Sequence, residues 1–543
     1  MRYHRLTIAL TVRVRRRAWA SFVFALVVML APPAGARQAT YTNPVIAGDF
    51  PDPTVIRVGE DYWAATTSGT WAPHFPVLHS RDLVNWRVAG YVFRVPPRWV
   101  KSDFWAPELV HDRGRFLVYY TARRDEGPRQ PGTLCVAVAT APQPAGPYTD
   151  HGPLVCEIRE LKNVGSIDAF FVRDERGSPH LVWKADGNDA EPDQPTSIFA
   201  QRLDESGTKL LGRRREILRN TATWERHVAE GSYILRRGEW FYHFYSGNAC
   251  CGRGCAYALG VARARRLLGP WEKHPRNPIL DANEDWRCPG HGSLVTTPDG
   301  RDFLLYHSYR RRRDTFNVGR EALLDEVKWG ADGWPVVNAG RGPSSVAPTP
   351  LGVAEREDEA EVFDNFDGPE LSLPWQWPMF VRQTARFERE GGGLLVLTPV
   401  SNPKRDAVAG AVLARPTVSG SYTAEARVDA RGMPARAGAG LAAYSWRDAA
   451  VGVTYGGGKV TAWRREGDAH RTVATADAPG TPSVFLRLTA EGGETYRFAF
   501  SGDGRAGVEL GGAVDGKHVE GARLALTAGG GPARFDWVRI KSK

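Results

Sequence analysis

A fivefold internal repeat is the feature that most limits how this chain can fold. Five segments share one plan: an ionisable residue, an apolar run, a tight turn and an aromatic-rich run. They begin at Asp52, Glu108, Asp168, Glu230 and His291, with spacings of 56, 60, 62 and 61 residues. A period of this length indicates one supersecondary unit that is repeated along the chain.

Each repeated segment predicts a β-hairpin. Turn sequences such as Val-Gly-Glu-Asp at 58–61 and Pro-Asp-Gly-Arg at 298–301 lie between runs rich in β-branched and aromatic residues. A second strand pair follows within most units, so that one unit holds about four strands. Four-stranded units in radial repetition make a β-propeller. We therefore predict an all-β fold with a five-bladed β-propeller over residues 41–340.

The composition changes after the last repeat. Residues 341–360 are rich in Gly, Pro and Ser and then acidic, which predicts a linker. Residues 361–543 contain at least eight short alternating runs, such as "SYTAEARV" and "YRFAFSGD", without helical periodicity. This pattern predicts a β-sandwich.

The first 36 residues have the features of an export signal. Four arginines at 13–17 precede an apolar run of 13 residues at 18–30, and Ala34-Gly-Ala36 offers a cleavage site. The apolar run is too short for a membrane span, so we expect its removal, no stable membrane anchor, and a periplasmic or extracellular location. Removal of six arginines and no acidic residue lowers the formal charge from +10 to +4, which argues against nucleic-acid binding.

Six cysteines accompany this export signal, at 135, 156, 250, 251, 255 and 288. Their spacing is not that of a zinc site, and an oxidising compartment permits disulfides. We therefore favour structural disulfides, with Cys135–Cys156 as one expected pair. The pairing among the other four is left open.

The repeat also predicts where charge gathers. Equivalent positions in the blades of a propeller face one axis, so the five leading residues should surround one mouth of the central channel. Glycosidases cleave their substrate between two carboxyl groups; in inverting enzymes these stand about 6.5–9.5 Å apart, which leaves room for a water molecule. Acids from different blades could be placed across such a gap.

Three segments resemble glycoside hydrolase family 43: "NPVIAGDFPDPTVIRVGEDYW", "SIDAFFVRDERGSPHLVWK" and "AEGSYILRRGEWFYHFYS". The resemblance implies a five-bladed propeller and inverting hydrolysis of arabinose- and xylose-containing glycans. It assigns Asp52 as the general base, Asp168 as the residue that orients substrate and modulates pKa, and Glu230 as the general acid. His291 matches a family histidine that can lie near a calcium ion through water, so calcium is an optional cofactor. Glu108 is not assigned a catalytic role.

Other residues are candidates for contacts with substrate. Trp71, Phe75 and Trp105 follow strand ends near the expected mouth and could stack on a pentose or pack within a blade. Arg320 matches a family arginine that points toward the active centre, with a structural ion pair as the alternative. Asp49 is either a rim contact or a solvated loop residue.

The C-terminal region resembles the concanavalin-like β-sandwich, or jelly roll, that follows the propeller in β-xylosidases and arabinofuranosidases of this family. It could cover the active-site mouth or bind glycan through Trp375, Trp377 or Trp446. The oligomeric state is not indicated by the sequence.

The residues therefore favour an exo-acting β-xylosidase, α-L-arabinofuranosidase or both, acting on plant-type polysaccharides or oligosaccharides. An arabinanase or galactan-acting hydrolase of the same family is the first alternative. A non-catalytic carbohydrate-binding propeller is the second.

Overall fold

The computed structural model describes most of the chain after residue 38. The described residues are 39–125, 133–156, 161, 164–190, 195–311, 316–352, 361–381, 383–388, 393–400, 407–467, 469–505 and 507–543. The expected signal peptide, residues 1–36, lies outside these ranges, as does the second part of the expected linker, residues 353–360.

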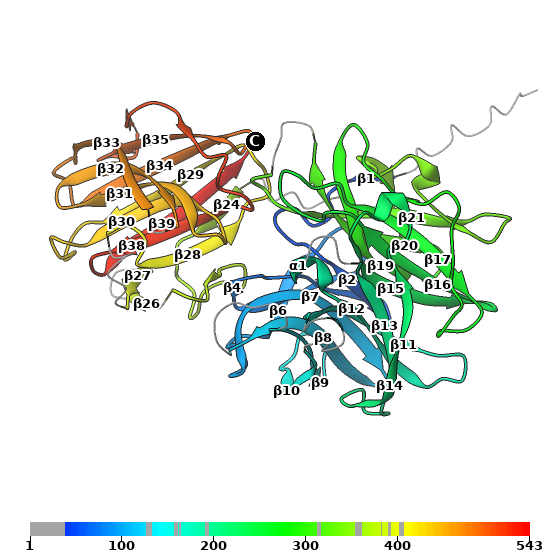
Figure 1. Cartoon of the computed structure of the whole chain (residues 1–543). Helices are drawn as coiled ribbons and strands as arrows, with labels where there is room; N and C mark the ends of the chain where they lie inside the picture. Colours follow the sequence, from blue (N-terminus) through cyan, green and yellow to red (C-terminus); the bar gives the residue numbers. More distant parts are fainter. Residues whose placement is uncertain are drawn as a thin grey trace, which may run out of the picture. The chain divides into compact units, whose positions relative to one another are not determined.

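Five four-stranded antiparallel sheets follow one another along the chain, as the repeat requires (Figure 1). In each sheet the strands lie in sequence order, because each hairpin is extended by the next pair. The strands, sheet by sheet, are β2 (Thr54–Val58), β3 (Asp61–Ala65), β5 (His74–Ser80) and β6 (Arg87–Phe93); β7 (Val100–Asp112), β8 (Arg115–Arg124), β9 (Leu134–Ala141) and β10 (Thr149–Val155); β11 (Ser166–Arg173), β12 (Pro179–Ala185), β13 (Ser197–Leu203) and β14 (Leu210–Arg219); β15 (Ala229–Arg237), β16 (Trp240–Gly247), β17 (Ala258–Ala264) and β18 (Glu272–Lys273); and β19 (Trp286–Thr296), β20 (Asp302–Arg310), β21 (Glu321–Trp329) and β22 (Pro335–Val337).

The first strands of the five sheets contact one another in a closed order. Strand β2 contacts β7, β7 contacts β11, β11 contacts β15, β15 contacts β19, and β19 returns to β2. Apolar side chains fill the spaces between successive sheets; Phe75, Phe104 and Tyr120, for example, pack between the first two sheets. The leading end of each repeat therefore faces a common centre.

A left-handed backbone residue lies in, or just before, each first strand. These residues are Asp52, Ala106, Asp168, Gly231 and His291, with φ between 43° and 61°. In the last four strands the pairing register shifts at this position, which is the mark of a β-bulge. A bulge turns the side chain out of the ladder. The residues at these positions therefore present their side chains to the centre rather than to a neighbouring strand.

Two small sheets and several short helices complete this part of the chain. Strand β1 (Thr40–Thr42) pairs with β23 (Val346–Pro348). The described part of the expected linker, 341–352, is therefore hydrogen-bonded to the segment that precedes the first sheet. Strand β4 (Trp71–Ala72) pairs with β25 (Trp377–Pro378). The short helices are α1 (Gly187–Ala190), η2 (Thr223–Glu225) and η3 (Asn338–Gly340).

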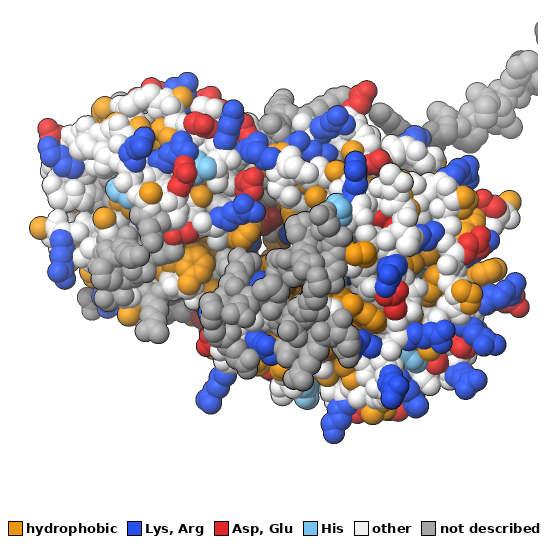
Figure 2. Space-filling model, in the orientation of Figure 1, with side chains coloured by type: hydrophobic (Ala, Val, Ile, Leu, Met, Phe, Trp, Pro, Cys, Tyr) orange, Lys and Arg blue, Asp and Glu red, His pale blue; other side chains and the backbone are white. Residues whose placement is uncertain are grey.

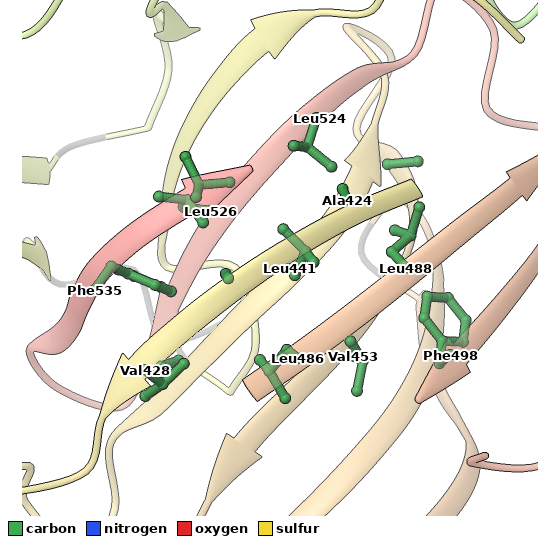
Figure 3. Close-up of a cluster of buried hydrophobic side chains, with 14 of the residues drawn as sticks. Ala424, Val428, Leu441, Val453, Leu486, Leu488, Phe498, Leu524, Leu526 and Phe535 are labelled. Carbon is green, nitrogen blue, oxygen red and sulfur yellow. The ribbon is translucent and has the colours of Figure 1, made fainter. Parts of the chain in front are cut away.

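The C-terminal part forms two large antiparallel sheets. The larger holds β24 (Glu361–Asp364), β26 (Gln383–Glu388), β27 (Leu394–Pro399), β29 (Tyr422–Asp429), β34 (Ser483–Glu491), β35 (Thr495–Ser501), β36 (Val508–Glu509), β37 (Val514–Asp515) and β39 (Ala533–Ser542); the smaller holds β28 (Ala411–Pro416), β30 (Gly438–Tyr444), β31 (Ala449–Gly456), β32 (Lys459–Glu466), β33 (Ala469–Asp477) and β38 (Arg523–Gly529). One apolar cluster lies between them, and Figure 3 shows Leu441 and Leu526 of the smaller sheet beside Leu486 and Phe535 of the larger. This is the expected sandwich.

Three disulfides join the six cysteines. The expected pair Cys135–Cys156 is confirmed, and the other four pair as Cys250–Cys251 and Cys255–Cys288.

Charged side chains of both signs are interspersed over the face shown in Figure 2. Within the described ranges, no helix is long and apolar enough to cross a membrane.

The sandwich core should carry much of the stability of the C-terminal part. Leu486 is fully buried on β34, whereas Val473 on β33 is 43% exposed. We expect Leu486→Ala to lower the free energy of unfolding of this part by about 2–5 kcal/mol, because the cavity cannot be refilled. Urea unfolding measures the loss. Val473→Ala is the matched control, and equal midpoints for the two variants would contradict this account of the core.

Candidate active site

A pocket of about 570 Å³ opens where the five first strands meet. Each sheet contributes to its lining: Asp52 precedes β2, Trp105 lies on β7, Asp168 on β11, Glu230 on β15 and His291 on β19. Asp52, Asp168 and Glu230 are only 7–8% exposed as whole residues, so they lie deep in the pocket. The structure thus brings together the three acids that the sequence singles out.

Asp52 is a buried carboxylate with a full set of partners. Its Oδ1 accepts a hydrogen bond from Arg320 Nη1 at 2.9 Å, its Oδ2 accepts one from Thr67 Oγ1 at 2.7 Å, and His307 Nδ1 lies 3.2 Å from Oδ1. Burial alone would raise the pKa of Asp52, but Arg320, His291 and His307 outweigh it and hold the pKa well below its usual range. Asp52 is therefore ionised at neutral pH.

The pKa of Asp168 is affected by both of the other acids. Burial raises its pKa to about 6; His291 opposes this shift, while the charges of Glu230 and Asp52 add to it. The Oδ2 atom of Asp168 accepts the backbone N–H of Gly231 at 3.0 Å, which ties it to the residue after Glu230. His291 Nδ1 is 3.5 Å from Asp52 Oδ1 and 3.9 Å from Asp168 Oδ2.

Glu230 is held from two sides. Lys184 Nζ on β12 donates to its Oε2 at 2.5 Å, and Tyr257 Oη donates to its Oε1 at 2.9 Å. Lys184 also donates to Asp186 Oδ1 at 3.0 Å, so the buried ammonium is shared between two carboxylates. Both Lys184 and Asp186 line the pocket.

Arg320 lines the pocket and forms an ion pair with Asp52. It therefore both points toward the active centre and takes part in an ion pair, the two alternatives expected from the sequence. Its backbone N–H donates to Asp49 Oδ1 at 3.0 Å. Asp49 therefore lines the rim and fixes the segment that carries Arg320.

Glu108 departs from the expected ring. It is absent from the described lining of the pocket, and its Oε2 accepts a hydrogen bond from Thr54 Oγ1 at 2.8 Å. The bulge in β7 places Ala106, two residues earlier, at the leading position. Glu108 therefore points elsewhere, and burial raises its pKa to about 8.

The three aromatic candidates differ in their exposure and in whether they line the pocket. Trp105 lines the pocket and is partly exposed. Trp71 reaches the pocket wall but is 1% exposed, packed edge-on against Tyr444 of the sandwich. Phe75 is fully buried among Phe93, Phe104 and Tyr120, so the expectation that it contacts substrate is wrong; its ring fills the space between two sheets.

The sandwich also contributes to the pocket. Trp446, Arg447, Glu520 and Gly521 are part of its lining, and Trp446 is 37% exposed. Trp375, by contrast, is buried and donates to Asp364 Oδ2 at 2.7 Å, while Trp377 pairs with Ala72. Of the three sandwich tryptophans considered for glycan contact, Trp446 is the one that reaches the described pocket.

Several residues of the site are not among those singled out from the sequence. Lys184 lies in the run "HLVWKADGN", which reads as an ordinary buried strand, and Tyr257 follows a cysteine-rich loop. His307 and Thr67 hold Asp52 from strands or turns away from the recognised motifs. A charged residue inside an apolar strand, as at Lys184, was the one available hint, since a buried lysine requires a carboxylate partner.

The expected calcium near His291 stays a prediction. Calcium prefers six to eight oxygen ligands. In the described parts of the chain, no three or more His, Cys, Asp or Glu side chains form a group that could hold one ion, and His291 Nδ1 faces Asp52 and Asp168. These residues do not make a metal site by themselves, and no step below involves a metal.

A deep pocket with several carboxyl groups, one of them held ionised, has the equipment for acid–base cleavage of a glycosidic bond. The fold and site thus define a carbohydrate-cleaving hydrolase. Residues 41–335 match the glycosyl hydrolases family 43, and residues 363–541 match the beta xylosidase C-terminal concanavalin A-like domain. The chain belongs to glycosyl hydrolases family 43 and is a glycosidase.

Individual relatives agree with this placement. The chain is 30% identical to xylosidase/arabinosidase 43B of Humicola insolens over 423 residues, which cover 75% of this chain and 74% of that protein. It is 28% identical to a xylan 1,3-beta-xylosidase of a Vibrio species, covering 62% of this chain and 64% of that protein. The crystal structure of the BlXynB protein of Bacillus licheniformis superposes with a TM-score of 0.76 at 25% identity, covering 93% of this chain and all of that chain.

The ion pair of Asp52 with Arg320 predicts a specific pH effect. In Arg320→Met the pKa of Asp52 should rise, so the acidic limb of the kcat/KM profile should move about 1–3 units to higher pH. Arg320→Lys keeps a positive charge and should move it less. An acidic limb that stays in place in both variants would show that Arg320 does not control Asp52.

Proposed function

We propose that this protein is an inverting, exo-acting glycosidase that releases xylose, arabinose or both from plant-type oligosaccharides or polysaccharides. The observation that carries this proposal is the unequal setting of the acids in one pocket: Asp52 is held ionised by Arg320, while Glu230 and Asp168 lie beside each other. We also propose that the five sheets are the blades of a five-bladed β-propeller, on the evidence of the closed order of contacts among their first strands.

The chemistry follows from these settings. Asp52 takes a proton from a water molecule, which attacks the anomeric carbon. Glu230 donates a proton to the glycosidic oxygen as the bond to the leaving group breaks. Asp168 accepts the N–H of Gly231 and so fixes the strand that carries the acid. No covalent intermediate is needed, since water is the nucleophile.

Lys184 fixes the position of the proposed acid. Its buried ammonium contacts both Glu230 and Asp186, and so it holds the side chain of Glu230 in the pocket.

The choice of sugar rests on the relatives and on the pocket. The similar Humicola insolens protein is a xylosidase/arabinosidase, and the similar Vibrio protein is a xylan 1,3-beta-xylosidase. Residues of the sandwich join those of the five sheets around the pocket, which favours a closed site for a chain end over an open groove. An arabinanase or galactan-acting enzyme would use the same acids and remains the alternative for the substrate.

We also propose that the chain consists of a catalytic part at 41–340, a linker at 341–360 and a sandwich at 361–543. Export is supported by the three disulfides, which persist in oxidising compartments.

The assignment of base and acid predicts different responses to the leaving group. Asp52→Ala and Glu230→Ala should each lower kcat about 10³-fold on natural oligosaccharides. With a dinitrophenyl glycoside, which leaves without protonation, Glu230→Ala should recover most of its rate and Asp52→Ala should not. Steady-state kinetics with both substrates make the test.

Glu108→Gln is the matched control, because it replaces a half-buried carboxyl outside the described pocket lining by a neutral isostere, and its rates should stay near those of the unaltered protein. Near-normal turnover by purified Asp52→Ala or Glu230→Ala would remove the assignment.

The substrate is tested with a small panel. We expect release of nitrophenol from 4-nitrophenyl β-D-xyloside, α-L-arabinofuranoside or both, and single sugars from the ends of oligosaccharides. Mid-chain cleavage of arabinan or galactan would establish the alternative. No release from any substrate would contradict the glycosidase proposal as a whole.

A further inference from the structure

A disulfide between adjacent residues lies in the wall of the catalytic pocket. Cys250 and Cys251 are bonded to each other and both line the pocket that holds the three acids. They belong to the loop 248–257, which joins β16 to β17. The catalytic chemistry described above makes no use of this bond.

This bond does little for the stability of the fold. A disulfide stabilises mainly by shortening the loop that the unfolded chain must close, and the effect grows with loop length. Cys135–Cys156 and Cys255–Cys288 span 21 and 33 residues, whereas Cys250–Cys251 spans one. Its value to the protein must therefore lie in the local surface that it creates.

Both ends of the loop are anchored at the catalytic acid. At the start, Ser246 and Gly247 of β16 pair with Glu230 and Ala229 of β15. At the end, Tyr257 donates to Glu230 Oε1. Because Glu230 is proposed to protonate the leaving oxygen, the loop stands on the side of the leaving group.

The loop is held firmly in this place. Cys255 is bonded to Cys288 of β19, the Gly252 N–H donates to Tyr309 Oη at 3.2 Å, and the Asn248 N–H donates to the carbonyl of Glu225 at 2.9 Å. A surface fixed in this way can contact a ligand with little loss of conformational entropy.

The disulfide lies nearer the mouth than the acids do. Cys251 is exposed and Cys250 is half-buried, whereas Glu230 is buried. The next sugar of a substrate chain extends from the scissile bond toward solvent, which is the direction of the disulfide. Asn248, Arg447 and Glu520, which also line the pocket, offer polar groups to its hydroxyls.

We propose that the Cys250–Cys251 disulfide is the contact surface for the sugar on the leaving-group side of the scissile bond. Two bonded sulfurs make a rigid, polarisable surface that lacks a thiol donor, suited to the apolar C–H face of a pentose or hexose ring. The inference rests on the proposed role of Glu230, and it adds the residues that recognise the second sugar.

The test compares substrates with and without that second sugar. Xylobiose carries a leaving-group sugar, whereas β-D-xylosyl fluoride leaves a single atom; the arabinose equivalents serve if arabinose is preferred. In Cys250→Ala/Cys251→Ala, kcat/KM for xylobiose should fall about tenfold and that for the fluoride should stay within twofold. Cys135→Ser/Cys156→Ser, which removes a bridge outside the described pocket lining, should leave the ratio of the two values unchanged.

Equal changes for the two substrates, or none for xylobiose, would overturn the proposal. If the Ala variant fails to fold, the single variant Cys251→Ser gives the same comparison. Free thiols at both positions in the purified protein would also overturn it. If the unaltered protein cleaves neither substrate of either sugar, the proposed function fails instead, so the two failures are distinct.

Discussion

The buried charge of Asp52 is the interaction on which the site depends. A carboxylate taken out of water is costly unless it is paired. Its partners come from the first and the last of the five repeated units. Thr67 follows β3 of the first sheet, whereas His291 and His307 lie on strands of the fifth sheet and Arg320 directly precedes its strand β21. The charge can be accommodated only when these two sheets have come together.

Further contacts join the segment before the first sheet to the fifth sheet and stabilise the closed order of the five sheets. Ile46 forms a bridge with Ala322 of β21, and the side chain of Asn43 donates to the carbonyl of Leu324 at 3.0 Å. Both residues immediately precede the segment that carries Asp49 and Asp52. The contacts that bring the first and fifth sheets together therefore also bring Asp52 to its partners. Asp49 takes part by accepting the N–H of Arg320.

Much of this arrangement could be predicted from the sequence, because hairpins repeat and ionisable residues recur at their leading ends. The period could not show the bulges, which shift the leading position to Ala106 in β7 and to Gly231 in β15. This is why Glu108 is misplaced in the expected ring, while Glu230, one residue before the bulge, still reaches the pocket. Phe75 and Trp105 could not be told apart, since both are aromatic residues near strand ends and only packing decides which is enclosed.

The central claim is that water, activated by Asp52, displaces the leaving group directly. Proton NMR of the first sugar released from a β-xyloside, recorded before mutarotation, tests it most directly. Direct displacement by water predicts α-xylose as the initial product, because it inverts the configuration at the anomeric carbon. Initial release of β-xylose would mean a covalent intermediate and would contradict the roles given to Asp52 and Glu230.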